Sequence, residues 1–152
     1  MIRIKILKTI LGMYEILLIP FIIFISIISR FFPKKYDIGL GPIPMINNVY
    51  HKRALELYGY KTETFVAELY YITDQFDKKF IYKKRISNYI FIKIMHIDYF
   101  FSIFRYKCLY LYFNGGCLRS SIVLWRLEPF FLRLAGIKIV VMPYGGDVSK
   151  QD

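Results

Sequence analysis

The chain has 152 residues, enough for one domain with a hydrophobic core but too few for two full domains and a membrane anchor. It is 56% hydrophobic and carries a formal net charge of +11. No RNA-binding pattern accompanies its 14 Tyr and 14 Phe residues. This composition favours anionic lipid head groups or phosphorylated substrates as partners, and we expect no nucleic-acid partner.

The first segment, residues 1–33, predicts a membrane anchor. Residues 10–29 are apolar apart from Glu15 and two serines, and a helix of this length is about 30 Å long, enough to cross a bilayer core. Three basic residues lie on each side of it, so the charge count does not fix its orientation. It suits a helix that lies in the interface or a re-entrant anchor bent at Pro20, and leaves open whether the helix spans the membrane. The alternative is a buried core helix of a soluble protein.

The next segment predicts a strand, a glycine-containing loop and a helix. Residues 36–40 are expected to form the strand, and the Gly and Pro residues of 39–44 exclude regular structure. Asn47 or Asn48 is expected to cap the helix, and Gly59 to end it. Such a corner exposes free amides and a helix dipole, which favour phosphate or sugar groups. The side chains expected to pack on a sheet are Ile46, Tyr50, Ala54, Leu57 and Tyr58.

Three further strands are predicted, over residues 62–72, 107–113 and 137–142. The last is apolar apart from Lys138, and such a run is typical of a buried parallel strand. Because strands alternate with helices, we expect an α/β fold, a Rossmann-like parallel sheet flanked by helices and preceded by the hydrophobic membrane helix.

Two further helices are expected, over residues 86–104 and 118–127. The first is aromatic-rich and follows the basic cluster 83–85, so it is expected to rest on a membrane surface, to pack on the sheet, or both. Pro129 is expected to start a separate short helix. The residues expected on the inner face of the second helix are Leu118, Ile122 and Trp125.

Glycine-containing loops follow three of the strands, at residues 39–44, 114–116 and 144–147. In parallel sheets ligands bind beyond the carboxyl ends of the strands, so these loops predict a site on one rim. No motif of a serine hydrolase, a zinc protease or a P-loop is present. Cys108 and Cys117 are too few for a zinc site or a disulfide framework, and we expect neither a metal nor a bound cofactor.

Three segments, IGLGPIPMINNVYHKRALELYGYKTETFV, LYFNGGC and GIKIVVMPYGGDV, together resemble the N-terminal half of GT-B-fold glycosyltransferases. The similarity covers residues 36–148 and is strongest to bacterial enzymes that build cell-surface polysaccharides and glycolipids. It implies that residues 34–152 form a Rossmann-like acceptor domain. The implied reaction transfers a hexosyl-type sugar from a nucleotide-sugar to a glycan or lipid-linked acceptor, on the cytoplasmic face of the bacterial inner membrane.

The resemblance also implies site residues. Asp147 or His51 would be the general base that activates the acceptor hydroxyl. Each also has a simpler interpretation, since Asp147 could cap a following helix and His51 could lie on a helix surface. The residues expected by position to line the substrate cleft are Gly41, Pro42, Asn47, Asn48, Asn114, Gly115, Gly116, Gly145 and Gly146.

A second Rossmann-like domain, which holds the nucleotide-sugar in this family, is not found within the 152 residues. We therefore expect that the chain alone does not catalyse transfer. Either the sequence is a fragment, or the donor domain is a separate partner chain. The alternative function is a non-catalytic, membrane-anchored α/β scaffold or partner subunit.

Overall fold

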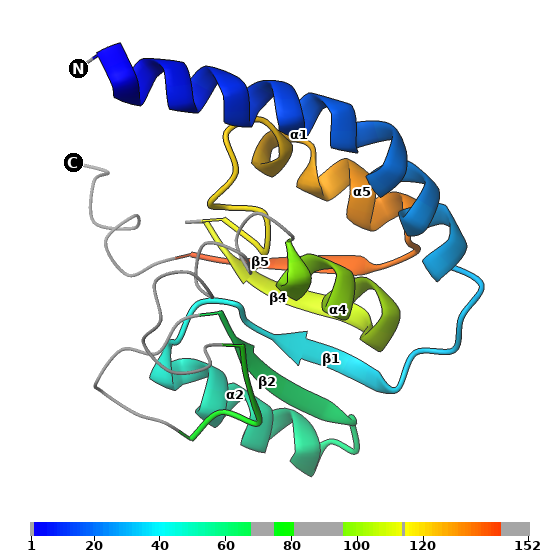
Figure 1. Ribbon diagram of the computed structural model, residues 1–152. Coiled ribbons are helices and arrows are strands. Elements are labelled where there is room, and N and C mark those ends of the chain that lie inside the picture. The colour runs from blue at the N-terminus through cyan, green and yellow to red at the C-terminus, as the bar shows by residue number, and fades with distance from the viewer. Residues whose placement is uncertain (1, 68–74, 81–95, 114, 144–152) are drawn as a thin grey trace, which may run out of the picture.

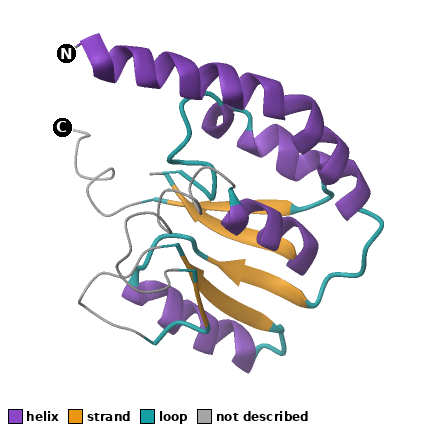
Figure 2. Ribbon diagram, viewed as in Figure 1, coloured by secondary structure: helices purple, strands orange, loops and turns teal. Residues whose placement is uncertain are grey.

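The computed structural model describes residues 2–67, 75–80, 96–113 and 115–143. These residues form a five-stranded sheet in the order β3-β2-β1-β4-β5, and every neighbouring pair is parallel (Figure 2). The fold is therefore α/β and Rossmann-like, as the alternation of strands and helices predicts. The strands are β1 (Tyr36–Leu40), β2 (Thr62–Val66), β3 (Lys78–Lys79), β4 (Tyr106–Tyr112) and β5 (Lys138–Met142).

Helices cover both faces of this sheet. One face is covered by α2, and α4 and α5 lie on the other face, where α1 packs over α5 (Figure 1). Helix α1 is long and apolar enough, over Lys8–Ser29, to cross a membrane by length and composition. It also contributes Ile22 to the core. The helices are α1 (Ile2–Ser29), α2 (Ile46–Leu57), α4 (Ile97–Arg105), the 3-10 turn η1 (Leu124–Arg126) and α5 (Glu128–Leu134).

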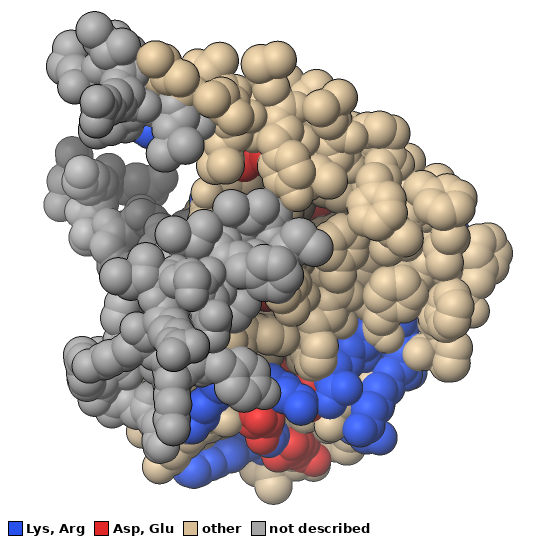
Figure 3. Space-filling view, viewed as in Figure 1, with Lys and Arg blue, Asp and Glu red and all other residues tan. Residues whose placement is uncertain are grey.

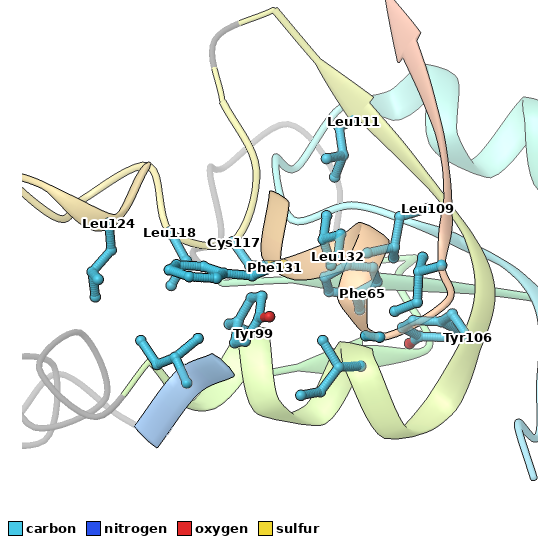
Figure 4. Close-up of a cluster of buried hydrophobic side chains, with 14 residues drawn as sticks. Phe65, Tyr99, Tyr106, Leu109, Leu111, Cys117, Leu118, Leu124, Phe131 and Leu132 are labelled. Carbon is cyan, nitrogen blue, oxygen red and sulfur yellow. The ribbon is translucent and has the colours of Figure 1, made fainter. Parts of the chain in front are cut away.

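The main core lies between the sheet and the α4/α5 layer (Figure 4). Its centre is a stack of two rings, Phe65 and Tyr106, whose centroids are 5.2 Å apart at 19°. A Cβ at position 39 would lie 2.6 Å from the Tyr106 ring, so Gly39 leaves the space that this ring fills. Its place in the strand is explained by packing without any ligand.

Helix α2 presents a different face to the sheet from the one predicted. Asn48 and Val49 are buried, and Val49 packs with Val66 and Phe76. The helix begins at Ile46, and no side chain caps it, so the predicted Asn cap is wrong. The predicted inner stripe is also wrong, since its members are exposed: Ile46, Tyr50, Ala54, Leu57 (88%) and Tyr58 (83%). Gly59 does end the helix, with a φ of +84° that favours glycine.

The predicted helix over residues 118–127 does not form. In its place the chain makes turns and the 3-10 turn η1. The buried Glu15 carboxylate explains this, because it accepts the amides of Ile122 and Val123, which an α-helix over these residues would donate to its own carbonyls. Amides bonded to side chains cannot make the regular α-helical ladder. Only Leu118 of the predicted inner stripe is buried, while Ile122 and Trp125 are exposed.

Pro129 lies in the first turn of α5, as predicted, where its missing N–H costs nothing. Strand β5 forms where expected but at the edge of the described sheet, with only β4 beside it. Val141 is 48% exposed, so the prediction of a buried strand is wrong. Parts of three predictions lie outside the described residues: the strand predicted over 68–72, the basic cluster 83–85 and the predicted helix up to residue 95.

Candidate functional site

The carboxyl ends of β1 and β4 share one edge of the sheet, and the loop after β1 is pressed closely onto β2. A Cβ at position 41 would lie 2.1 Å from the carbonyl oxygen of Phe65, so only glycine fits there. The Pro42 carbonyl accepts the Ala67 amide at 3.1 Å. Both Gly41 and Pro42 are buried, which makes them part of the support for this rim.

The Asn48 side chain links the loop after β1 to the end of β4. Its Nδ2 donates to the Ile43 carbonyl at 3.0 Å, and its Oδ1 accepts the Tyr112 hydroxyl at 2.8 Å. The first turn of α2 is thereby held against the last residue of β4. Because both ends of the Asn48 amide are used and the residue is buried, it positions the loop and leaves little to offer a ligand.

The turn after β4 is built around two glycines and a buried glutamate. Gly115 has a φ of +105°, and its amide donates to the Tyr112 carbonyl at 3.0 Å. A Cβ at position 116 would lie 2.2 Å from a carboxylate oxygen of Glu128. That carboxylate accepts the amides of Cys117 at 2.7 Å and Leu118 at 3.0 Å. Gly116 therefore makes room for Glu128.

Glu128 is the titratable group of this rim that sequence reasoning missed. Burial raises its pKa to about 7, although the two amide hydrogen bonds act in the opposite direction. In the sequence it is an ordinary acidic residue in the first turn of a helix. Its burial depends on the turn that folds over it, which no local pattern predicts.

The predicted site residues fall into three groups: those at least partly exposed on α2, those that are part of the rim's support, and those outside the described residues. Asn47 is exposed at the start of α2, and His51 is half-buried, edge-on to the Tyr110 ring with centroids 6.5 Å apart. Gly41, Pro42, Asn48 and Gly116 are buried, and Asn48 joins its segment to Tyr112 at the end of β4, just before the 115–116 turn. The predicted residues that lie outside the described part of the chain are Asn114, Gly145, Gly146 and Asp147.

The opposite edge of the sheet holds a second polar cluster. Arg105 makes a two-point ion pair with Glu63, at 2.5 and 2.6 Å, and the Tyr106 hydroxyl donates to the same carboxylate at 2.7 Å. Burial alone would raise the pKa of Glu63, but these hydrogen bonds hold it below its usual value. The Arg105 guanidinium also lies 4.8 Å from the Tyr36 ring centroid. Because these charged groups are paired with one another, we interpret the cluster as part of the structure and not as a ligand site.

Within the described ranges, no group of three or more His, Cys, Asp or Glu side chains is placed to hold a metal ion. Cys117 is buried, and burial raises the pKa of its thiol. The proton-transfer candidates at the rim are thus His51 and Glu128 in the described part of the chain.

No protein-family model, curated protein or solved structure matches this chain. The interpretation of the rim therefore depends on its residues and on the fold.

Proposed function

We propose that this chain is the acceptor-side half of a membrane-associated GT-B-type glycosyltransferase. In this proposal the rim binds a glycan or lipid-linked acceptor, and a second Rossmann-like unit brings the nucleotide-sugar. The observation that carries the proposal is that the segment 41–48 is joined to the end of β4, which the 115–116 turn follows, at the carboxyl edge of a parallel sheet, through the Asn48–Tyr112 hydrogen bond. The resemblance of these same segments to the family supports it.

Within this proposal the exposed side chain of Asn47 contacts the acceptor, while Asn48, Gly41 and Gly116 hold the loops in place. The base is His51 or Asp147. A base must come within hydrogen-bond reach of the attacking hydroxyl. For His51 this requires an acceptor that lies along α2 beside Tyr110, whose ring the imidazole already meets edge-on.

A second candidate function is a non-catalytic membrane scaffold, and one observation favours it. Gly39, Gly41 and Gly116 are each required by a contact within the protein, namely with Tyr106, Phe65 and Glu128. The glycines therefore need no ligand to explain them. A scaffold would use the α/β domain to hold a partner, and its rim would bind no sugar.

Hydrogen exchange of the full chain in nanodiscs separates the two functions. The discs contain phosphatidylglycerol with or without a polyprenyl-diphosphate-linked N-acetylglucosamine as the acceptor probe. The acceptor-half proposal predicts slower exchange at residues 43–48 and 115–118 only when the probe is present. Exchange that is unchanged at both segments would overturn the proposal and leave the scaffold.

The matched variants are Asn47→Ala and Arg53→Ala, both exposed on α2. Asn47 lies in the first turn at the rim, and Arg53 lies two turns further on. We expect Asn47→Ala to abolish the probe-dependent protection and Arg53→Ala to leave it unchanged. Equal protection in both variants would contradict the assignment of Asn47 to acceptor binding.

A further inference from the structure

Helix α1 keeps polar groups on its inward face, beside the core residue Ile22, and over residues 10–29 exposes only apolar side chains on its outward face. The inward face carries Glu15, Ser26 and Ser29, each at most 2% exposed. Between residues 10 and 29 the exposed side chains are all apolar, and none carries a charge. The large members are Ile10 (59%), Met13 (62%), Ile16 (54%), Leu17 (76%), Phe21 (52%), Phe24 (61%) and Ile27 (42%).

The inward polar groups bind α1 to the α/β domain. The Glu15 carboxylate accepts the amides of Ile122, at 2.9 Å, and Val123, at 2.6 Å. The Ser26 hydroxyl is hydrogen-bonded to the Tyr99 hydroxyl at 2.8 Å. These contacts join residues 73 to 108 positions apart in the sequence. A helix that crossed a bilayer away from the domain would break all of them and leave a carboxylate in hydrocarbon.

The exposed apolar surface continues past the end of α1. Phe31 is 81% exposed, and Phe32 packs edge-on against Phe104 with ring centroids 5.5 Å apart. We call the exposed apolar residues of α1 together with Phe31, Phe32 and Phe104 the α1 patch. In the space-filling view the region over α1 is almost entirely free of charged atoms (Figure 3). A continuous apolar surface of this kind marks an interaction site on a soluble protein.

Charges lie at the border of the α1 patch. Arg30 and Lys35 are exposed directly after the helix, and Lys34 donates to the Ser29 carbonyl at 2.5 Å and to the Ile103 carbonyl. In Figure 3 the blue atoms gather along the lower edge of the apolar surface. Apolar side chains flanked by cations, on a chain of net charge +11, complement the acyl and anionic head-group layers of one leaflet.

We propose that α1 lies in the plane of an anionic membrane as the lipid-facing layer of the α/β domain and does not cross the bilayer. The occupant of the α1 patch is one leaflet of phospholipid. This inference rests on the membrane association in the proposed function and adds its geometry, and it does not depend on sugar transfer. It also places the domain directly on the head groups, with no tether between membrane and fold.

The depth of three α1 positions tests the geometry. Trp125 is the single tryptophan, so Trp125→Phe provides a silent background for Ile10→Trp, Leu17→Trp and Phe24→Trp. Each full-length variant is bound to vesicles of equal parts phosphatidylcholine and phosphatidylglycerol, brominated near the head group or near the chain end. An in-plane helix predicts that all three tryptophans are quenched equally and more strongly by the head-group-proximal bromines. Deep quenching at Leu17→Trp with shallow quenching at the other two would overturn the proposal, as would no quenching at all.

A stability measurement supplies an independent arm, in case a tryptophan variant fails to fold. Glu15→Leu leaves the amides of Ile122 and Val123 without their acceptor, so we expect Tm in detergent to fall by about 5 °C or more. The matched control is Ile16→Leu, an exposed apolar exchange expected to leave Tm unchanged. A spanning helix predicts the opposite, that Glu15→Leu has no effect on Tm or raises it. Failure of either test leaves the rim protection experiment intact, so the two proposals can fail separately.

Discussion

Helices α1 and α2 lie on opposite sides of the same sheet, and each buries at least one polar side chain while exposing large apolar ones. On α2 the outward apolar residues are mixed with charges, since Arg53 and Glu56 share the exposed surface with Tyr50 and Leu57. On α1 the exposed surface between residues 10 and 29 carries no charge. An inward polar residue alone therefore does not identify a membrane helix. The absence of charge from the outward face is what separates α1 from α2.

The largest expected effect concerns Glu128, which shapes the turn on which α1 rests. Its folded pKa of about 7 lies above the ordinary value of 4.5, so the folded state binds the proton more tightly than the unfolded state. Its stabilising contribution is therefore complete below about pH 4.5 and is lost as the pH rises through 7. A shift of this size corresponds to roughly 3 kcal/mol.

Urea unfolding followed from about pH 5 to pH 8 measures this loss, and Glu128→Gln is expected to remove it. Glu63, whose pKa is lowered, acts in the other direction: its contribution is lost as the pH falls below its ordinary value, outside this window. A Glu128→Gln profile that declines as steeply as the wild type would contradict the assignment.

The next effect tests the inward contact of α2. Asn48→Ala removes two buried hydrogen bonds, to the Tyr112 hydroxyl and to the Ile43 carbonyl, so we expect a loss of about 2 kcal/mol of unfolding free energy. The neighbouring exposed variant Asn47→Ala is the control, expected to change stability by less than about 0.5 kcal/mol. Chemical denaturation of both variants provides the measurement. If the two variants are equally stable, the predicted role of Asn48 as the link between the loops is wrong.

A smaller effect tests the corresponding contact of α1. Ser26→Ala removes the hydrogen bond to the Tyr99 hydroxyl, and we expect a cost of about 1 kcal/mol. A double-mutant cycle with Tyr99→Phe should show coupling of about the same size. Purely additive losses would mean that this contact does not hold α1 on the domain.

The smallest effect on stability is expected from placing a charge on the outward face of each helix. This change tests the difference between α1 and α2 most directly. Phe24→Lys and Leu57→Lys alter exposed positions, so each should change unfolding free energy by less than about 0.5 kcal/mol. Vesicle sedimentation should separate them. We expect Phe24→Lys to weaken binding to phosphatidylglycerol vesicles roughly tenfold and Leu57→Lys to have no effect. Equal weakening would erase the distinction between α1 and α2.

Several features of the fold follow from local sequence. The strand at 36–40, the strand from 107 onward, the end of α2 at Gly59 and the start of α5 at Pro129 each depend on a residue's own backbone preference or on a short apolar run. Such preferences act in any context, so the α/β class and the order of elements could be predicted. The rim could be located in the same way, because parallel strands place their following loops on one edge.

The inward faces of the helices, the helix expected over 118–127 and the burial of β5 were decided only by tertiary structure. Asn48 points inward because the Tyr112 hydroxyl, 64 residues away, is there to bind it. The expected helix gives way to turns because Glu15 takes the amides of Ile122 and Val123, which an α-helix would need. Strand β5 is half-exposed because the order of the sheet places it at an edge. The sequence by itself therefore determined the α/β class and most of the elements, since these depend on neighbouring residues. Long-range hydrogen bonds decided how the helices face the sheet and where an expected helix is replaced by turns.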